Sequence, residues 1–536
     1  MSVLRGTTCF YRAFSSARSS TVLTGDSFGS LHRSDVRVER LVRPNNEKVD
    51  FDAPPPSRKI KSLAVPLSLS KKQREQLEKQ QSREAPPSPH QCFIECSRPE
   101  FNLLEPKSGV RSPLCSQYWV KNKYSDEWFI IKRRTKEPSS RFVVWDNAWD
   151  HYVPDRLHPS VREVLQELSV KVPTQIQSQC LQVFPSKYHL FIAAETGSGK
   201  TIAYGAPLIT KILQQKRKGI KERAVVLAVT SSLKEQTFSV LSKLASRTDL
   251  TVSICGLGKD IPSDWDVLVG TPGLVEKYMR QKEIGSEVMH LILDEADMIL
   301  DESFTEVLTE VFALIPIANS VTNSQDSGAR VIFCSATCPE ELECLADGVV
   351  ERQFLRYIKS PNLHSLLPNV DLKFIRVREK DKISTLESLL SQDLKRGELN
   401  QTMVFCKDRD TAHFVYKELN SFGEIVTEWN PSCTDDDEKA RIFVATDGAA
   451  RGIDLPRLSH VINYDLSPNP VSFLHRIGRI GRQSSSFLGR VTSFVRTPRE
   501  VQLTNAIEAA AREGRALSTL TADIRNGIYG NNDDEQ

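Results

Sequence analysis

The stretch LILDEADMILDESF, residues 291–304, joins a short apolar run to a cluster of acidic side chains. Residues 291–293 have the composition of a buried strand, and Asp294, Glu295 and Asp297 follow it directly. Burying a carboxylate is unfavourable unless it is paired or binds a cation. These acids therefore either lie in solvent at a strand end or face a cation, and the rest of the sequence must distinguish the two.

Two series of short apolar runs alternate with helical patterns along the chain. The first series is HLFIAAE, AVVLAVT, DVLVGT, LILDEA and VIFCSAT, and the second is TMVFCK, EIVTEW, RIFVATD, HVINYD and VTSFV. Apolar strands separated by helices are typical of parallel sheets covered on both faces. The sequence therefore predicts an α/β fold with two such sheets in tandem. The expected ranges are a first domain at 150–358, a linker at 359–372, a second domain at 373–515 and a tail at 516–536.

A glycine-rich turn follows the first predicted strand, in AAETGSGKT at residues 193–201. Glycines let backbone amides surround phosphate oxygens, Lys200 can reach the terminal phosphates, and the Thr201 hydroxyl can bind Mg²⁺. Ala194 stands where the pattern usually has its first glycine. The residues expected to bind ATP here are Ala194, Glu195, Thr196, Gly197, Ser198, Gly199, Lys200 and Thr201.

The phosphate loop favours the second explanation of the acidic strand end. In phosphate-loop NTPases an aspartate at the tip of a buried strand holds the metal, and Asp294 fits that role. Glu295 is placed to orient or deprotonate the attacking water. Asp297 is expected to pair with other groups of the site. The predicted cofactors are therefore ATP and Mg²⁺, with Thr201 and Asp294 as metal ligands.

Seven motifs occur in order over about residues 150–500: PTQIQ (173–177), AETGSGKT (194–201), TPG (271–273), DEAD (294–297), SAT (335–337), ATDGAARGID (445–454) and HRIGRIGR (475–482). In this ordered series the chain resembles the DEAD-box RNA helicases. The resemblance implies two RecA-like domains, ATP hydrolysis and RNA as the partner.

The resemblance also implies roles for individual residues. Gln177 would read adenine, Tyr152 would stack on it, and Asp454 would contact ribose. Arg479 and Arg482, three residues apart on one helical face, would neutralise charge on the transferring phosphate, although they could instead be a surface arginine cluster. The catalytic set is Glu295, Asp294, Lys200, Arg479 and Arg482. The coupling set is Asp297, Ser335, Ala336, Thr337 and His475, and the RNA-binding set is Thr271, Pro272, Gly273, Thr446 and Arg451.

The stretches expected to bind RNA depart from the family pattern. The family usually has Pro-Thr-Arg-Glu-Leu where this chain has VTSSL at residues 229–233, so the arginine is missing. The connections at 256–265 and 430–439 are also short for parallel crossovers, which normally take about a dozen residues or more. Acidic residues occupy 435–437 in the second connection. Either exon pieces are missing from the gene model, or the contacts with RNA have been reduced in this lineage.

The N-terminal region is basic and has few periodic patterns. Residues 1–150 carry 26 Lys+Arg and 17 Asp+Glu, whereas the remainder carries 45 and 51. Residues 1–20 contain three arginines, are rich in serine and precede the first acid, which is typical of a mitochondrial transit peptide. Residues 21–149 are expected to be a poorly structured basic extension. This extension either meets nucleic acid or is a solvated tail.

The predicted function is an ATP-dependent RNA helicase of the mitochondrial matrix. Three segments, at 73–84, 301–304 and 363–370, resemble one mitochondrial member of the family that is associated with assembly of the large mitoribosomal subunit. The expected partners are mitochondrial rRNA and mitoribosomal assembly proteins. An alternative is an ATP-binding assembly clamp with weakened unwinding. A DNA helicase or general phosphate-loop ATPase is a further alternative, against which an adenine-reading Gln177 argues.

Two kinds of protein are disfavoured by composition. No window approaches 18 continuous apolar residues, so no membrane span is expected. The 11 cysteines include no CxxC pair, so neither a zinc knuckle nor a disulfide framework is indicated.

Overall fold

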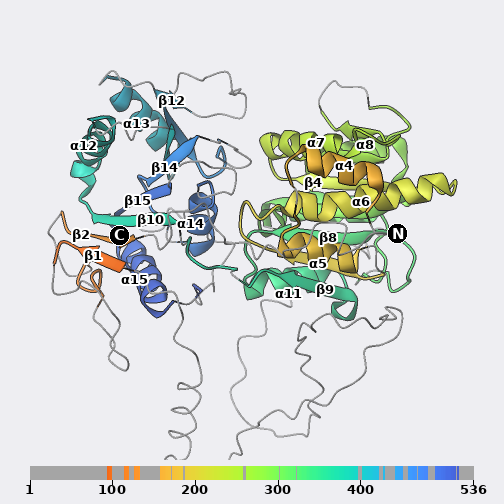
Figure 1. Ribbon diagram of the computed structural model, residues 1–536, viewed down its shortest axis with the longest axis horizontal. Helices are drawn as coiled ribbons and strands as arrows, with labels where there is room; N and C mark the ends of the chain where they lie inside the picture. Colours follow the sequence, from red (N-terminus) through yellow and green to blue (C-terminus); the bar gives the residue numbers. More distant parts are fainter. Residues whose placement is uncertain are drawn as a thin grey trace, which may run out of the picture. The chain divides into compact units, whose positions relative to one another are not determined.

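The computed structural model describes two α/β lobes and a small N-terminal addition to the second lobe (Figure 1). The described residues are 93–98, 114–119, 126–132, 157–170, 172–184, 187–256, 261–300, 302–320, 323–361, 363–367, 369–395, 401–421, 426–428, 441–450, 455, 457–467, 469–480, 489–514 and 516–517.

The first lobe contains a seven-stranded, wholly parallel sheet in the order β5-β6-β4-β7-β8-β3-β9. Its strands are β3 (His189–Ala193), β4 (Arg223–Ala228), β5 (Val252–Ile254), β6 (Val267–Gly270), β7 (Val288–Asp294), β8 (Arg330–Ser335) and β9 (Leu355–Lys359). Its helices are α4 (Pro159–Glu167), α5 (Gln175–Val183), α6 (Lys200–Arg217), α7 (Ser231–Ala245), α8 (Pro272–Lys282), α9 (Ala296–Ile299), α10 (Thr305–Leu314) and α11 (Glu340–Val349). Short 3₁₀ turns lie at Gly285–Glu287, Glu302–Phe304 and Arg352–Phe354.

Helices cover both faces of this first sheet, which explains its continuous apolar strands. One buried cluster joins α4, α5, α6 and α7 to one face. The other joins α8, α9, α10 and α11 to the opposite face, where the rings of Phe191 and Phe333 stack. The predicted parallel sheet is confirmed, and its strand ends deliver the glycine-rich loop and the acidic residues to the same edge.

The second lobe contains an eight-stranded sheet in the order β1-β2-β10-β15-β14-β11-β13-β12. Its six parallel strands are β10 (Val370–Arg376), β11 (Gln401–Cys406), β12 (Val426–Glu428), β13 (Ile442–Thr446), β14 (Leu458–Asn463) and β15 (Gly489–Val495). Helices α12 (Lys382–Lys395) and α13 (Arg409–Ser421) cover one face. Helices α14 (Pro470–Ile477) and α15 (Pro498–Glu513) cover the other, and a 3₁₀ turn at Glu379–Asp381 precedes α12. The second predicted parallel sheet is also confirmed.

The two remaining strands, β1 (Phe93–Cys96) and β2 (Trp128–Lys132), come from the predicted extension. Together with the turn at 114–119 they form what we call the N-terminal annex. Strand β2 pairs antiparallel with β10, and β1 pairs with β2. Phe129 is fully buried and stacks on Phe374 with ring centroids 4.9 Å apart. The expectation of a poorly structured extension therefore does not hold for the annex.

A buried carboxylate fixes the turn of the annex to the second lobe. Glu508 of α15 accepts hydrogen bonds from the backbone amides of Cys115 (2.8 Å) and Ser116 (3.1 Å) and from the Ser116 hydroxyl (2.9 Å). Arg512 donates to the same carboxylate at 2.7 Å. A buried charge needs such partners, and the annex supplies three of the hydrogen bonds to Glu508. The annex is therefore an integral part of the second lobe.

Parallel strands flank both of the short connections noted in the sequence. Strand β5 pairs in parallel with β6, and β12 pairs in parallel with β13. Residues 257–260 and 429–440 lie outside the described residues. The described parts of the first connection, 255–256 and 261–266, contain no helix.

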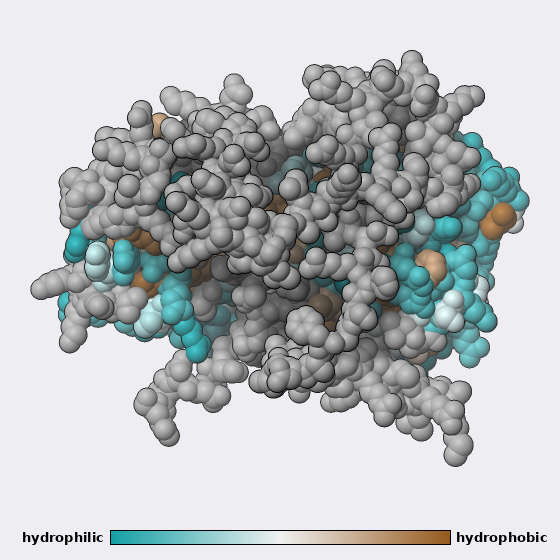
Figure 2. All heavy atoms as spheres, turned by 90° about the horizontal axis from the view of Figure 1, so that it is seen from below, coloured by the Kyte–Doolittle hydropathy of each residue, from teal (hydrophilic) through white to brown (hydrophobic). Residues whose placement is uncertain are grey.

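The surface of the described residues is mostly hydrophilic on the face that Figure 2 shows, with scattered apolar side chains. Among the described residues, no helix is both long enough and apolar enough to cross a membrane.

Candidate active site

The glycine-rich loop lies between β3 and α6, and its backbone requires glycine at two positions. Gly197 and Gly199 have φ angles of 78° and 80°, a region that other residues seldom adopt. A Cβ atom on Gly199 would lie 2.4 Å from Gln177 Nε2. Helix α6 begins at Lys200, so its first amides point into the loop. Such an arrangement binds phosphate well.

Gln177 and Thr174 support this loop from helix α5. The two residues form a reciprocal cap at the start of α5, in which Gln177 Oε1 accepts from the Thr174 amide at 2.9 Å. Gln177 Nε2 donates to the Gly199 carbonyl at 3.3 Å, and the Thr174 hydroxyl donates to the Ser198 carbonyl at 3.2 Å. The predicted adenine reader is therefore directly attached to the phosphate loop.

The ammonium of Lys200 lies inside the loop. Its Nζ donates to the carbonyls of Ala194 (2.8 Å) and Glu195 (3.1 Å). Burial lowers the pKa of Lys200, and the nearby carboxylate of Asp294 opposes that shift. The side chain thus stands between backbone acceptors and the acidic strand end, where a terminal phosphate could attract it.

Asp294 ends strand β7 and is only 4% exposed. Its carboxylate accepts from the Tyr204 hydroxyl at 3.0 Å, the Thr237 hydroxyl at 3.4 Å and the Glu295 amide at 3.2 Å. Burial raises its pKa to about 6, and the charge of Glu295 adds to the effect. The sequence left open that Asp294 lies in solvent at a strand end, and its burial excludes this possibility.

Glu295 has an unusual backbone and an incompletely paired carboxylate. Its φ of 55° lies in the left-handed region, which is costly for a residue with a side chain. Its Oε1 lies 3.8 Å from Arg479 Nη2 of the second lobe. Its Oε2 is buried and has no hydrogen-bond partner within the described part of the chain. That free acceptor suits a bound water or hydroxyl group.

Asp297 joins the two lobes. Its Oδ2 accepts from the Thr337 hydroxyl at 2.8 Å and lies 2.8 Å from His475 Nε2. Burial acts to raise the pKa of Asp297, but His475 and the neighbouring hydroxyls outweigh it and lower the pKa to about 2. Ser335 Oγ accepts from the Thr337 amide at 3.2 Å. The predicted coupling residues are therefore brought together.

A second contact between the lobes occurs at the phosphate loop. The Thr196 hydroxyl donates to the Gly478 carbonyl at 3.0 Å, and a Cβ atom on Gly478 would lie 1.7 Å from that hydroxyl oxygen. A pocket lies at this contact. Glu195, Thr196 and Ala336 of the first lobe line it, together with Gly478 of the second lobe. Only glycine at 478 permits this approach.

Arg476 is a site residue that the sequence analysis missed. Its guanidinium makes a two-point ion pair with Asp447 (2.6 and 2.7 Å) and donates to Asn463 Oδ1 (3.1 Å) and the Asp465 carbonyl (2.6 Å). These contacts tie α14 to the ends of β13 and β14. A sequence signal for it exists, because Arg476 lies inside HRIGRIGR between His475 and Arg479, which are both predicted site residues.

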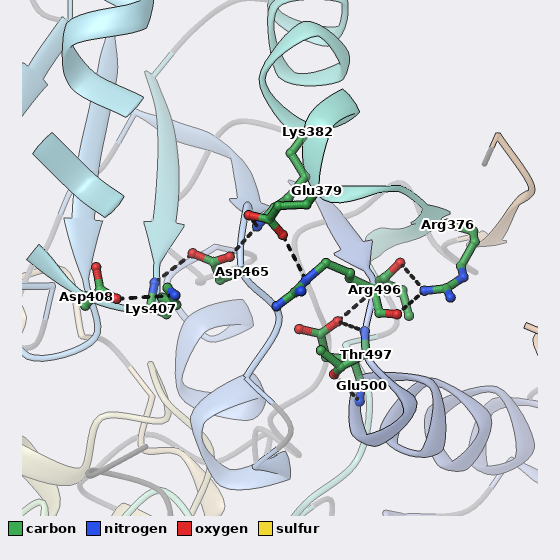
Figure 3. A network of polar contacts seen from close by, with 10 residues as sticks. Arg376, Glu379, Lys382, Lys407, Asp408, Asp465, Arg496, Thr497 and Glu500 are labelled. Carbon is green, nitrogen blue, oxygen red and sulfur yellow. Dashed lines mark hydrogen bonds and ion pairs between the residues drawn. The ribbon is translucent and has the colours of Figure 1, made fainter. Parts of the chain in front are cut away.

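Lys382 and the Lys407 amide hold the carboxylate of Asp465, as Figure 3 shows. The Lys382 side chain is almost fully buried, and its ammonium lies over the Tyr464 ring, 4.2 Å from the centroid. These contacts fix the strand ends of the second lobe next to α14. Helix α14 carries His475, and Arg479 follows just after its end.

The predicted RNA-binding residues lie at strand ends of both lobes. Thr271 and Pro272 begin α8, and the Thr271 side chain makes no capping hydrogen bond. A Cβ atom on Gly273 would meet open space. Thr446 ends β13, and its hydroxyl accepts from the Ala449 amide at 3.4 Å. Tyr152, Arg451, Asp454 and Arg482 lie outside the described residues.

The donor set fits Mg²⁺ bound together with phosphates. Thr201 and Asp294 offer a hydroxyl and a carboxylate, which are oxygen ligands that Mg²⁺ accepts, and Asp297 Oδ1 is a buried acceptor without a hydrogen bond among the described residues. No group of three or more His, Cys, Asp or Glu in that part of the chain could hold a metal alone. Mg²⁺ usually relies on substrate phosphates for the other ligands.

Comparison with known sequences gives concordant matches over both lobes. Residues 174–345 match the model of the DEAD/DEAH box helicase family, and residues 381–484 match the helicase conserved C-terminal domain. The chain is 31% identical to "Probable ATP-dependent RNA helicase DDX28" of Mus musculus, with 86% of this chain and 92% of that protein covered. The Homo sapiens protein of that name is 30% identical, with 88% and 94% covered.

Solved structures resemble the fold. One is S. cerevisiae Dbp5 bound to RNA and ADP BeF3, with a TM-score of 0.57, 22% identity, and 68% of this chain and 94% of that one covered. Another is Mss116p bound to ssRNA and AMP-PNP, with a TM-score of 0.57, 18% identity, and 72% and 80% covered. At these identities the likeness concerns the arrangement of the two α/β lobes.

Proposed function

Because the chain belongs to the DEAD-box ATP-dependent RNA helicases, we propose that it remodels mitochondrial rRNA or its ribonucleoprotein during assembly of the large mitoribosomal subunit. The family membership confirms the prediction made from the ordered motifs. The enzyme is an RNA helicase that hydrolyses ATP, and the specific RNA and the mitochondrial setting are the proposed part.

The observation that carries the proposed mechanism is the convergence of both lobes on Glu295 and Asp297. Arg479 Nη2 lies 3.8 Å from Glu295 Oε1, and His475 Nε2 lies 2.8 Å from Asp297 Oδ2. An arginine that crosses between lobes can neutralise charge on a transferring phosphate only when the lobes meet. This arrangement supports hydrolysis that depends on the contact between the lobes.

In the proposed mechanism, different residues of the chain bind the phosphates, orient the water and stabilise the developing charge. The loop amides and Lys200 hold the phosphates, so Lys200 exchanges its carbonyl acceptors for phosphate oxygens. Glu295, with its free Oε2, orients the attacking water. Arg479 stabilises the charge that develops, together with Arg482 beyond the described residues. Mg²⁺ held by Asp294 and Thr201 would supply further neutralising charge. Phosphoryl transfer of this kind depends mostly on positioning and electrostatics.

Substrate and coupling roles follow the same division. Gln177 and Tyr152 are assigned to adenine, and Asp454 to ribose. Thr271, Pro272, Gly273, Thr446 and Arg451 are assigned to the RNA backbone, where contacts carry little sequence information. Ser335, Ala336 and Thr337 would transmit lobe contact to the phosphate site through Asp297, because the Thr337 hydroxyl donates to Asp297.

The mitochondrial matrix assignment is supported by residues 1–20, which are basic, rich in serine and free of acids. The domain limits that we propose differ from the expected 150–358 and 373–515 at the linker, because β9 of the first lobe ends at Lys359 and β10 of the second lobe begins at Val370. The linker is therefore 360–369 in place of 359–372, and the annex is added to the second domain. The assembly-clamp alternative has less support, because a clamp does not need Glu295, Arg479 and a complete phosphate loop.

The first experiment measures the ATPase rate of the chain without residues 1–20, with and without structured mitochondrial rRNA. We expect RNA to stimulate the rate, and Glu295→Gln to abolish the stimulated rate while ATP still binds. A basal rate that does not respond to RNA would favour the clamp. A fusion of residues 1–20 to a fluorescent protein tests the targeting separately, and a cytosolic signal would refute it.

A further inference from the structure

We propose that Tyr204 is a positioning residue that makes Asp294 a one-oxygen ligand and thereby favours Mg²⁺ over larger divalent cations such as Ca²⁺. The inference rests on Mg²⁺ being the cation in the proposed function, and it adds what selects that cation. Tyr204 lies outside all of the motifs described above.

Tyr204 is a fully buried residue whose hydroxyl needs a partner inside the protein. It is one of the core residues of α6, one turn after the helix begins at Lys200. A buried hydroxyl without a hydrogen bond is unfavourable. The Tyr204 hydroxyl donates to Asp294 Oδ2 at 3.0 Å. The side chain is therefore held at the end of β7, where its hydroxyl fixes one carboxylate oxygen.

The two carboxylate oxygens of Asp294 are occupied unequally. An ionised carboxylate has about four positions at which it can accept a hydrogen bond or bind a cation. Two hydroxyls use Oδ2, from Tyr204 at 3.0 Å and from Thr237 at 3.4 Å. Within the described residues, Oδ1 accepts only the Glu295 amide, at 3.2 Å. The position that remains is on Oδ1, so Asp294 can offer one oxygen to a cation while the protein holds the other.

Tyr204 lies beside both of the proposed metal ligands. Thr201 and Tyr204 are three residues apart in α6 and therefore share a face of the helix. Burial raises the pKa of Tyr204, and an interaction with the Thr201 hydroxyl opposes that shift, so the two hydroxyls lie close together. Burial also raises the pKa of Asp294, and the nearby Lys200 ammonium opposes it. The carboxylate that Tyr204 holds therefore borders the phosphate loop.

The number of oxygens that a carboxylate offers distinguishes Mg²⁺ from Ca²⁺. Mg²⁺ requires nearly octahedral ligands at about 2.0–2.1 Å, which a single carboxylate oxygen can satisfy, whereas the larger Ca²⁺ also accepts both oxygens of one carboxylate. With Oδ2 held by two hydroxyls, Asp294 cannot offer both oxygens. A hydrogen-bond partner of a metal ligand also keeps that ligand oriented, and its loss lowers metal affinity about 10- to 100-fold. Tyr204 thus both orients Asp294 and restricts it.

The test measures nucleotide binding and not turnover. The affinity of the full chain for mant-labelled AMP-PNP is determined with saturating Mg²⁺, with saturating Ca²⁺ and with EDTA. We expect the wild type to bind this analogue more tightly with Mg²⁺ than with Ca²⁺. Tyr204→Phe removes only the hydroxyl, so it should weaken binding with Mg²⁺ about tenfold and change binding with Ca²⁺ or EDTA less than about twofold. The preference for Mg²⁺ should therefore fall.

Two further variants accompany Tyr204→Phe. Thr237→Val removes the longer of the two hydrogen bonds to Asp294 Oδ2 and should give a smaller change in the same direction. It decides the test if urea unfolding shows that Tyr204→Phe is not folded. Tyr357→Phe is the matched control, because the Tyr357 ring stacks on Phe191 in β9, which β8 and β3 separate from β7. It should leave all three affinities unchanged.

Three results would overturn the inference. An equal loss of affinity with Mg²⁺, Ca²⁺ and EDTA refutes it, because a hydroxyl that only stabilises the fold does not distinguish the cations. Unchanged affinity with Mg²⁺ in both Tyr204→Phe and Thr237→Val also refutes it, while the proposed function stands. Equal binding by the wild type with Mg²⁺ and with EDTA refutes the proposed role of Mg²⁺, and the inference fails with it.

Discussion

Asp294 illustrates how burial changes the properties of an ordinary carboxylate at the position where we propose a cation. Its hydroxyl partners, Tyr204 and Thr237, come from α6 and α7, and burial raises its pKa to about 6. Glu295 beside it keeps one oxygen free, at the cost of a left-handed backbone. Strain of this kind is typical of functional positions. The backbone of Gly199 is also constrained, because its positive φ and the close approach of Gln177 both exclude a side chain.

Gly199→Ala is expected to lower ATP affinity at least tenfold and to lower the free energy of unfolding by more than about 1 kcal/mol. The added Cβ atom would meet Gln177 Nε2 at 2.4 Å in addition to the left-handed strain. Fluorescent-ATP titration and urea unfolding measure the two effects. Gly219→Ala is the control, since Gly219 has a φ of 75° with nothing within 4 Å of its Cβ position. Equal losses in both variants would contradict the role of the contact with Gln177.

At the scale of elements, buried polar groups hold neighbouring strands in register. His189 of β3 accepts from the Val331 amide of β8 at 2.9 Å, and its other ring nitrogen lies 2.8 Å from the Ala318 carbonyl. It is fully buried, and burial lowers its pKa to about 4. In the second lobe, the annex protects a strand edge. Strand β2 covers the edge of β10, which would otherwise be free to pair with another chain.

The lowered pKa of His189 predicts acid sensitivity of the first lobe. The unfolded chain binds a proton near pH 6.5 and the folded chain only near pH 4, so stability is full above pH 6.5 and falls as the pH drops toward 4. The loss amounts to about 3 kcal/mol at most. His189→Gln, which can keep both hydrogen bonds, should show a flatter dependence in urea unfolding across this range. Parallel curves for the two proteins would refute the assignment.

Phe129→Ala in the annex is expected to lower the free energy of unfolding of the second lobe by about 3–5 kcal/mol, because a fully buried ring stacked on Phe374 is removed. Phe93→Ala is the matched control: Phe93 lies in β1 of the same annex and is 50% exposed. It should cost less than about 0.5 kcal/mol. Urea unfolding followed by tryptophan fluorescence measures both. A small effect of Phe129→Ala would mean that the annex does not contribute to the stability of this lobe.

At the scale of the whole molecule, residues of the two lobes contact one another at the proposed catalytic site. Asp297 meets His475, Glu295 meets Arg479, and Thr196 meets Gly478. Each pair joins a motif that holds phosphate or activates water to one that supplies positive charge. Arg476 fixes α14 through its ion pair with Asp447 and its hydrogen bond to the Asp465 carbonyl. Lys382 in turn holds the Asp465 carboxylate (Figure 3). In the mechanism that we propose, these contacts link ATP hydrolysis to the approach of the lobes.

Gly478→Ala tests that link. The added Cβ atom would lie 1.7 Å from the Thr196 hydroxyl oxygen, so the lobes must separate at this point and Arg479 must withdraw from Glu295. We expect kcat of the RNA-stimulated ATPase to fall more than tenfold while affinity for ATP stays within about twofold, since one displaced donor of this kind costs about a hundredfold or more. Steady-state kinetics with a separate nucleotide titration measure the split. A loss confined to ATP affinity would contradict the proposed link.

The sequence alone determined the two parallel sheets, the phosphate loop and the acidic strand end, because continuous apolar strands and residues at fixed short spacings reflect local physical requirements. Gly199, Lys200 and Asp294 could be found in this way.

Only the tertiary structure identified Tyr204 and Thr237 as partners of Asp294, and Arg476 as the anchor of α14. These properties arise from contacts between segments far apart in the chain, to which no short pattern corresponds. The annex escaped prediction for a related reason. Strands of four and five residues carry too little periodicity to be recognised, and their stability comes from packing against β10 and α15.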